Sequence, residues 1–435
     1  TWVDGLNQDW CISRQRFFGV PFPVWYKIDE NGNADYNNPI FPKMEQLPID
    51  PMIDVPDGYT EMQRGQKGGF IGEKDIMDTW ATSSVTPQIA MAFAPEGHHI
   101  SLPFDVRPQA HDIIRTWAFY TIMKAFANEN TLPWYEAHIS GFVLDPDRKK
   151  MSKSKGNVIT PMSLLEKYSS DAVRYWASRA KLGIDALFEE QIMEQGKKLC
   201  MKFFNASRFV FNIVAQSGVD VNADYAAHIT QPIDKAWIGK MCDALDAARK
   251  AFDQNDYSFA LEVTEHTFWD FCDNYLEIVK GRAYGDDPTS AVSSLMLSID
   301  LFCKMFAPFL VFITEEIFQA RPWGKEEASV HVQPYPTSAM FADVKEDADL
   351  YNKVVSMVEA GRKAKADEKR SLRTPIMMLT VSASQKTIEA LNKALPDIEN
   401  VLNIKDHKAT FEAKTEDLQI TNCILGEDEP KKPKA

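Results

Sequence analysis

The spacing of apolar residues changes along the chain, and the change predicts two kinds of structure. In the first part, short continuous apolar runs end in turn residues, and the run 138–144 predicts a buried strand. From about residue 191 to 345, apolar residues recur every three or four positions, which predicts amphipathic helices packed as an antiparallel bundle. Four such stripes are Ile192, Gly196, Leu199, Phe203, Ala206 and Val210; Ile238, Met241, Leu245, Ala248 and Phe252; Phe259, Val263, Phe271, Tyr275 and Ile278; and Val292, Leu295, Ile299, Phe302 and Met305.

Two further stretches complete this pattern. Residues 113–122 are apolar nearly all round and predict a buried helix, whereas residues 27–72 are turn-rich and polar and predict a long insertion. The whole chain is therefore expected to combine α/β and all-α parts. The expected domains are 1–160, an α/β half domain; 161–190, a connector; 191–345, the helical bundle; 346–426, a basic helix with a small C-terminal α/β cap; and 427–435, a charged, proline-rich disordered tail.

Composition limits the class of protein. With 45% hydrophobic and 25% charged residues, the chain of 435 residues has the balance of a soluble globular protein. We see no apolar stretch of membrane-spanning length and no signal or transit peptide, so we expect a cytoplasmic protein without a membrane partner. The six scattered cysteines suit reduced thiols, and no zinc site or other metal ligand set is expected.

The net charge of −14 argues against a protein that coats nucleic acid through bulk charge. Two local basic stretches could still bind RNA, namely 148–155 and the run from Arg362 to Arg373.

The first basic stretch belongs to a loop, 147–157, that follows the expected strand and precedes Thr160 and Pro161, which suit a helix start. Its lysines are mobile point charges able to neutralise a polyphosphate. A solvated surface turn is the alternative for such a cluster. The loop is not a glycine-rich P-loop, because the Gly-x4-Gly-Lys-Ser/Thr pattern is absent from the sequence.

The order of residues in this loop resembles a known signature. Lys150, Met151, Ser152, Lys153 and Ser154 match, letter for letter, the Lys-Met-Ser-Lys-Ser motif of class I aminoacyl-tRNA synthetases. The resemblance implies an ATP-binding loop, with ATP present as its Mg²⁺ complex. It also implies catalytic roles for Lys150 and Lys153, which would engage the triphosphate, Lys153 stabilising charge as pyrophosphate leaves. Ser152 and Ser154 would belong to the same ATP-binding loop.

Two other blocks resemble the amino-acid pocket of this family. Residues 11–21, which include Ile-Ser-Arg-Gln, and residues 72–84, which include Asp-Thr-Trp, resemble blocks of the valyl and isoleucyl members. The resemblance implies a small apolar pocket shaped by Trp80, Ile76 and Phe18. The family often carries Trp near Phe18, and Phe17 and Phe18 could instead be core aromatics.

The resemblance also implies residues that would contact the ribose and the adenine of ATP. Residues 107–112 resemble the stretch that in this family often reads Gly-x-Asp, so Asp112 would lie near the ribose, although Ala110 replaces the Gly. Asp112 would equally serve as a plain helix cap. By the same resemblance Gly141, Phe142 and Val143 form the surface against which adenine lies.

The later segments extend the resemblance over nearly the whole chain. The expected fold is the second half of a Rossmann-like class I catalytic domain, followed by an antiparallel helical anticodon-binding bundle and the small α/β cap. Residues 109–117 and the close of the bundle favour the valyl members over the isoleucyl ones. The implied function is ATP-dependent activation of valine and its transfer to tRNA(Val), and the implied partners are ATP, valine and tRNA(Val), bound by a monomer.

One family signature, His-x-Gly-His, is not found in this sequence. We therefore expect these 435 residues to be the C-terminal portion of an enzyme that forms no valyl-adenylate alone. The alternatives are a portion of an isoleucyl enzyme and a non-catalytic tRNA-binding fragment.

Overall fold

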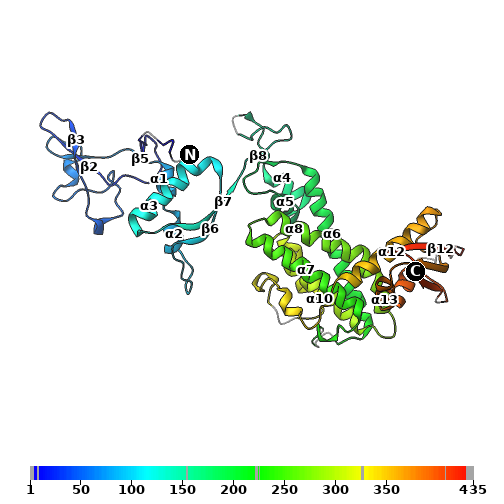
Figure 1. Cartoon of the computed structure of the whole chain (residues 1–435). Helices are drawn as coiled ribbons and strands as arrows, with labels where there is room; N and C mark the ends of the chain where they lie inside the picture. Colours follow the sequence, from blue (N-terminus) through cyan, green and yellow to red (C-terminus); the bar gives the residue numbers. More distant parts are fainter. Residues whose placement is uncertain are drawn as a thin grey trace. The chain divides into compact units, whose positions relative to one another are not determined.

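A computed structural model describes residues 4–6, 9–152, 155–220, 224, 226–324, 328–406 and 408–427, and it divides into two compact units (Figure 1). The first unit comprises residues 1–142 with 182–184, and the second comprises 143–181 with 185–435. Helices and sheets both occur, and each unit is described by itself. The expected tail, 427–435, lies almost wholly outside the described residues.

The first unit contains a parallel strand pair with a helical crossover. β6 (Phe104–Ala110) pairs with β7 (Trp134–Ser140) from Phe104 opposite Trp134 to Ala110 opposite Ser140. Between them run η3 (His111–Ile113), the π-helical η4 (Ile114–Ala118) and α3 (Phe119–Glu129). A parallel pair requires such a crossover, because the chain must return to the same edge of the sheet. The carboxyl ends of both strands therefore lie side by side.

The strand expected at 138–144 is displaced. The regular strand begins at Trp134 and ends at Ser140, and β8 (Val143–Leu144) is a separate strand that pairs in parallel with β9 (Ala186–Leu187) in the second unit. The apolar run therefore spans a break in the sheet.

The crossover helix is not buried all round, contrary to the expectation for 113–122. Its inner face buries Trp117 and Ala125, and Trp117 stacks on Trp134 with ring centroids 5.4 Å apart. Within 113–122 its outer face leaves Arg115 and Ile122 exposed. The apolar composition of this helix therefore did not predict which of its positions are buried.

The turn-rich stretch 27–72 is more ordered than its composition suggested. β2 (Trp25–Ile28) lies between β3 (Ala34–Ile40) and β4 (Phe70–Gly72) in an antiparallel sheet. Two short 3-10 turns, η1 (Met44–Gln46) and η2 (Glu61–Gln63), lie in the chain between β3 and β4. The Arg64 guanidinium organises the excursion, because it donates to the main-chain oxygens of Pro51 and Asp54 and lies over the Phe70 ring. The first unit is completed by β1 (Ser13–Arg14), β5 (Ile76–Met77), α1 (Thr79–Ser83) and α2 (Thr86–Ala92).

Helices dominate the second unit. Their bounds are α4 (Pro161–Tyr168), α5 (Ser170–Ser178), α6 (Glu190–Ser217), η6 (Ala226–His228), α7 (Pro232–Asp253), α8 (Tyr257–Asp270), the π-helical η7 (Phe271–Tyr275), α9 (Leu276–Ala283), α10 (Thr289–Phe306), α11 (Val311–Ala320), η8 (Val330–Val332), η9 (Ser338–Phe341) and α12 (Asp349–Asp367). Their core is rich in aromatic rings, with Trp237 stacked on Tyr275 at 4.7 Å and Phe203 edge-on to Phe268. Nearly all the stripe residues are buried or half-buried, but Phe259 is 44% exposed.

Helix α10 corrects the expectation that no apolar stretch reaches membrane-spanning length. Among the described residues it is the one helix long and apolar enough, at 18 residues, to cross a membrane. In this structure 89% of it is buried inside the protein, including Ser293, Ser298 and Asp300. It is the central helix of the unit's core.

A small sheet follows the helices. β10 (Ile376–Ser382) lies between β11 (Ala409–Glu412), which is parallel to it, and β12 (Gln419–Leu425), which is antiparallel. Between β10 and β11 the chain forms α13 (Gln385–Asn392) and α14 (Leu395–Val401).

A buried polar network joins this small domain to the helices. The fully buried Asp234 carboxylate of α7 accepts hydrogen bonds from the Tyr275 and Ser290 hydroxyls and from the Arg282 guanidinium of α9. Arg282 also pairs with Asp397 of α14, with Nε 3.2 Å from the nearer carboxylate oxygen. A buried charge is tolerated only when it is paired and hydrogen-bonded, so these groups depend on one another.

We predict that Asp234→Asn destabilises the second unit by about 3–5 kcal/mol, because it leaves Arg282 buried with one charged partner fewer. Urea unfolding followed by circular dichroism measures this change. Asp246→Asn, on an exposed position of the same helix, should stay within about 0.5 kcal/mol of the parent chain. Equal stability of the two variants would contradict the role of the network.

Candidate nucleotide and amino-acid site

Two side chains brace the base of the lysine-rich loop. One Asp145 carboxylate oxygen accepts a hydrogen bond from the Lys149 main-chain N–H at 2.8 Å, and the other accepts from the Asn157 carboxamide at 2.8 Å. The Asn157 oxygen in turn accepts from the Ser152 N–H at 2.9 Å. This set of bonds, the Asp145–Asn157 brace, fixes both ends of the loop to each other.

Charge strengthens the brace. Hydrogen bonds from Asn157 and from the Lys149 N–H favour the ionised carboxylate and hold the pKa of Asp145 below its usual value. Positive φ angles at Arg148 (61°) and Gly156 (68°) turn the chain at the two ends of the loop. Neither Asp145 nor Asn157 was among the expected site residues, although both flank the signature directly.

The signature residues divide between packing and solvent. The Met151 side chain packs against a buried cluster from α4, α5 and the start of α6, whose members are Leu164, Tyr168, Ala172, Phe188 and Met193. Lys150 is exposed and Ser152 is half-buried. Lys153 and Ser154 lie outside the described residues. Met151 thus anchors the motif to the helices while its neighbour Lys150 faces solvent.

The expected ribose and adenine residues gather at the carboxyl edge of the parallel pair. His111 and Asp112 directly follow β6, and Gly141 and Phe142 directly follow β7. The His111 ring meets the Phe142 ring edge-on at 4.2 Å, and its Nδ1 lies 3.2 Å from the Ser140 oxygen. Ligands of open α/β sheets bind at this edge.

Asp112 does not occupy the cap position that the alternative required. The residue before the η3 turn is Ala110, and Asp112 is exposed within the turn. Asp112 therefore adds negative charge to the first turn without capping it.

Gln109 is a candidate site residue that the sequence patterns did not predict. Its side chain is 7% exposed, and among the described residues neither atom of its carboxamide has a hydrogen-bond partner. Buried polar groups are almost always paired, so this amide suits a ligand group at the edge of the sheet. Its position directly before the expected ribose residues was the available signal.

The two blocks of the expected amino-acid pocket come together. β1 pairs with β5, and the Arg14 guanidinium lies 2.7 Å from the Asp78 carboxylate. Asp78 also caps α1 by accepting a hydrogen bond from the Trp80 N–H. A side chain at Gly19 would collide with Ile76, since a Cβ there would lie 2.2 Å from the Ile76 Cδ1. The sequence blocks are thus neighbours because of a strand pair and an ion pair.

The three expected pocket residues differ in their surroundings. Ile76 is buried beside Gly19, and the half-buried Trp80 packs against the group of Trp117, Ala118 and Trp134. Phe18 is 90% exposed, and its neighbour Phe17 is fully exposed. Neither phenylalanine is a core aromatic, so that alternative is wrong, and the pocket role of Phe18 stays a prediction.

The expected site residues belong to both units. Asp112, Gly141, Phe142 and the pocket residues lie in the first unit, whereas Val143 and the described signature residues lie in the second. Val143 is 42% exposed at the start of β8.

The second basic stretch is largely occupied with internal contacts. Lys365 is buried, donates to the main-chain oxygens of Leu372 and Leu402, and has its pKa lowered to about 8 by burial. Arg362 donates to the Asp273 oxygen, and Arg370 donates to the Gly426 oxygen. These three cations hold α12 in place, so the run is a weaker RNA-binding candidate than its composition suggested.

No group of three or more His, Cys, Asp or Glu side chains among the described residues could hold a metal ion, and the six cysteines are free. Among the cysteines, Cys11 is exposed and has its pKa lowered by its hydrogen bond to Ser13, whereas others are buried. Burial raises the pKa of Cys200 and Cys272 to about 12 each, which keeps these thiols protonated and unreactive.

Two families match the chain. Residues 1–189 match the class I tRNA synthetases (I, L, M and V), and residues 234–382 match the anticodon-binding domain of tRNA ligases. The chain belongs to the class I tRNA synthetase family.

Within that family, the similarity is to valine–tRNA ligases. The chain is 48% identical over 391 residues to the valine–tRNA ligase of Thermobifida fusca (strain YX), covering 88% of this chain and 44% of that protein. It is 42% identical over 468 residues to that of Bifidobacterium longum (strain DJO10A), covering 100% of this chain and 51% of that protein. The chain thus spans about half the length of these relatives.

The fold also has a counterpart among solved structures. The crystal structure of the ternary complex of Agrobacterium radiobacter K84 agnB2 LeuRS, tRNA and LeuAMS superposes with a TM-score of 0.59. The match covers 97% of this chain and 51% of that chain at 17% identity. At this identity the likeness concerns the fold alone.

We predict that Asn157→Ala loosens the lysine-rich loop, because the Ser152 N–H and the Asp145 carboxylate each lose a partner. Loss of about 1.4 kcal/mol of local stability corresponds to a tenfold rise in amide exchange. Hydrogen exchange of segment 145–157, followed by mass spectrometry, measures it.

Asn212→Ala, on an exposed position of α6, serves as the control and should leave exchange in that segment unchanged. If the Asn157 variant also exchanges at the parent rate, the brace does not order the loop.

Proposed function

We propose that this chain is the part of a valyl-tRNA synthetase that supplies the signature loop and the tRNA-binding domains. The reaction is the ATP-dependent activation of valine and its transfer to tRNA(Val). The observation that carries the proposal is the 42–48% identity to valine–tRNA ligases over most of the chain, with an intact signature on a braced loop. An isoleucyl enzyme is not favoured by these relatives.

The chemistry of the first step suits the residues present. The valine carboxylate attacks the α-phosphate of ATP, and pyrophosphate leaves with additional negative charge. Lys150 and Lys153 neutralise the triphosphate, and the brace limits the positions the loop can take, so that less order must be imposed when ATP binds. Mg²⁺ accompanies ATP as part of the substrate, with oxygen ligands from the phosphates.

The edge of the parallel pair would hold the rest of the nucleotide. Gly141 and Phe142 would offer a surface for adenine, the Asp112 carboxylate would accept hydrogen bonds from ribose hydroxyls, and Val143 remains an expected adenine contact from the start of β8. The Gln109 carboxamide, buried without a partner among the described residues, is a further donor and acceptor at this edge. Trp80, Ile76 and Phe18 would bound the valine side chain.

The second step requires tRNA. Residues 161–190 would follow the inner side of the tRNA, and the helical domain would contact its anticodon. Residues 234–382 match a family named for anticodon binding, which supports this assignment. The chain would work as a monomer in the cytoplasm, where its substrates are.

We predict that the chain binds tRNA(Val) at least tenfold more tightly than tRNA(Ile). Fluorescence anisotropy with the two end-labelled tRNAs, at the same salt concentration, measures both dissociation constants. A common salt dependence is expected for both, because phosphate contacts carry no sequence information.

Equal affinity for the two tRNAs would overturn the assignment to valine. Absence of binding to either would overturn the tRNA-binding role itself, and the two failures are distinguishable.

A further inference from the structure

The last strand among the described residues, β12, lies at the edge of its sheet, and its ladder with β10 has two irregularities. In the sheet order β11-β10-β12, β12 pairs with β10 alone among the described residues. Its sequence, Gln-Ile-Thr-Asn-Cys-Ile-Leu, contains no charged residue and no proline over seven positions. Proteins usually protect such edges with lysine, proline or a bulge on the outer side, because an open edge recruits other strands.

A groove runs along that edge. Its volume is about 570 Å³, and one wall comes from the C-terminal half of α12 through Ala360, Lys363, Ala364, Asp367 and Glu368. The other wall comes from residues 419–423 and Leu425 of β12. Successive side chains of a strand point to opposite faces, so a groove that touches five consecutive residues follows the edge of the strand.

The geometry points to one kind of occupant. The free edge of a strand presents main-chain donors and acceptors in alternation, and an extended polypeptide backbone presents the matching set. A helix beside a strand edge leaves a slot for a single strand, and the small side chains of Ala360 and Ala364, one turn apart, keep it open. We propose that an extended peptide segment of another protein adds to β12 in this groove.

Charge fixes the chemistry of that segment. The groove carries two carboxylates, from Asp367 and Glu368, against one ammonium, from Lys363, so its lining is net negative. The Arg370 guanidinium donates to the Gly426 oxygen, which sets the end of α12 beside the end of β12. The two carboxylates therefore lie toward the C-terminal end of β12. The peptide carries Lys or Arg at that end and uncharged β-branched residues along the strand.

An anionic ligand does not suit the same groove. RNA would place phosphates beside Asp367 and Glu368 and would find no stacking surface in the lining residues. The groove is therefore assigned to a peptide and not to the tRNA that the proposed function requires.

A defined probe tests the assignment on the full chain. The probe is a fluorescein-labelled synthetic peptide of alternating threonine and valine with two lysines at its N-terminus, matched to antiparallel addition. Strand addition depends mainly on main-chain hydrogen bonds and tolerates sequence, so saturable binding below about 1 mM is expected by anisotropy. The same peptide with alternate amides N-methylated should bind at least tenfold more weakly.

Variants distinguish peptide binding in the groove from non-specific peptide binding. Ala364→Phe fills the groove and should abolish binding, and Ala360→Leu provides a second, smaller obstruction. Ala366→Leu, at an exposed position of α12 outside the groove, is the matched control and should bind as the parent chain does. The double change Asp367→Asn with Glu368→Gln should weaken binding of the lysine peptide at least threefold, while a peptide with serines in place of the lysines is unaffected.

No saturable binding up to 1 mM would overturn the proposal. Equal binding by the N-methylated peptide, or by the Ala364→Phe chain with its parent fold verified by circular dichroism, would also overturn it. Sedimentation that shows a dimer of the parent chain but a monomer of the Ala364→Phe chain would also overturn it, because a second copy of the chain would then be the occupant. None of these outcomes bears on tRNA binding, which is tested separately.

Discussion

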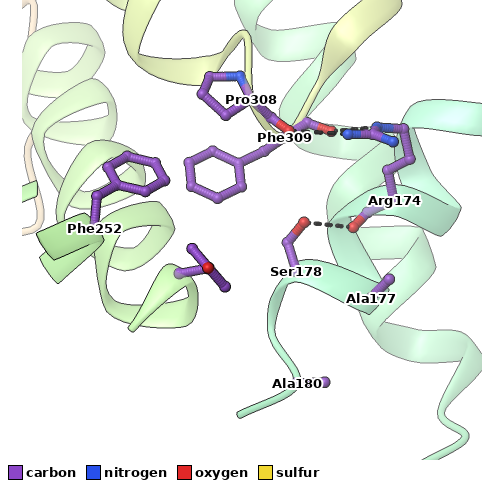
Figure 2. Close-up of a pocket in the computed structure, with 8 residues that line it drawn as sticks. Arg174, Ala177, Ser178, Ala180, Phe252, Pro308 and Phe309 are labelled. Atoms are coloured by element: carbon purple, nitrogen blue, oxygen red, sulfur yellow. Dashed lines mark hydrogen bonds between the residues drawn. The ribbon is translucent and has the colours of Figure 1, made fainter. Parts of the chain in front are cut away.

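One short helix, α5, holds the second unit together at the point where its loop meets its core. The buried Asp171 carboxylate accepts hydrogen bonds from the Phe312 and Ile313 N–H groups at the start of α11, at 3.1 and 2.7 Å. One turn later, the Arg174 guanidinium donates to the main-chain oxygens of Pro308 and Phe309 after the end of α10, as Figure 2 shows. The Asp171 carboxylate thus lies at the positive, N-terminal end of α11, and the Arg174 guanidinium lies at the negative, C-terminal end of α10.

Because of these contacts, α5 positions both the lysine-rich loop and the helices α10 and α11. The opposite side of α5 contributes to the cluster that receives Met151, while Tyr175 packs against Gly196 of α6 and donates to Glu265 of α8. Beside Arg174 lies a cavity of about 410 Å³, bounded also by Phe252 and Phe309 (Figure 2). The signature loop is therefore positioned by the same helix that holds α10 and α11, and the Asp145–Asn157 brace completes its local order.

Sequence patterns predicted those parts of the fold in which one face of an element is buried. The stripe on α6 is an example, since Leu199, Phe203 and Val210 are fully buried. Patterns failed where burial follows from tertiary context: α10 buries its serines as well as its apolar residues, and Ile122, in the stretch expected to be buried all round, is exposed. The sheet in 27–72 was missed because its stability comes from a few distant contacts, such as those of Arg64, and not from periodicity.

The candidate site shows the same division. The resemblance to the family implied that residues 11–21 and 72–84 shape one pocket, and in the structure the β1–β5 pair and the Arg14–Asp78 ion pair make the two blocks neighbours. Motifs could not predict Gln109, whose interest lies in its burial without a partner, or the role of Asn157, which depends on three hydrogen bonds across a loop. Burial and hydrogen bonding of this kind depend on the folded chain, so a sequence motif does not predict them.

We propose that the helices of the second unit recognise the anticodon of valine tRNA, because residues 234–382 match a family named for anticodon binding. The most direct measurement is the affinity of the chain for tRNA(Val) against the same tRNA carrying the isoleucine anticodon, at fixed salt. Exchange of the anticodon should weaken binding at least tenfold; the body of the tRNA and its phosphates are unchanged, so the difference reports the anticodon alone. Identical affinities would show that the helices bind tRNA without reading its anticodon and would contradict the account.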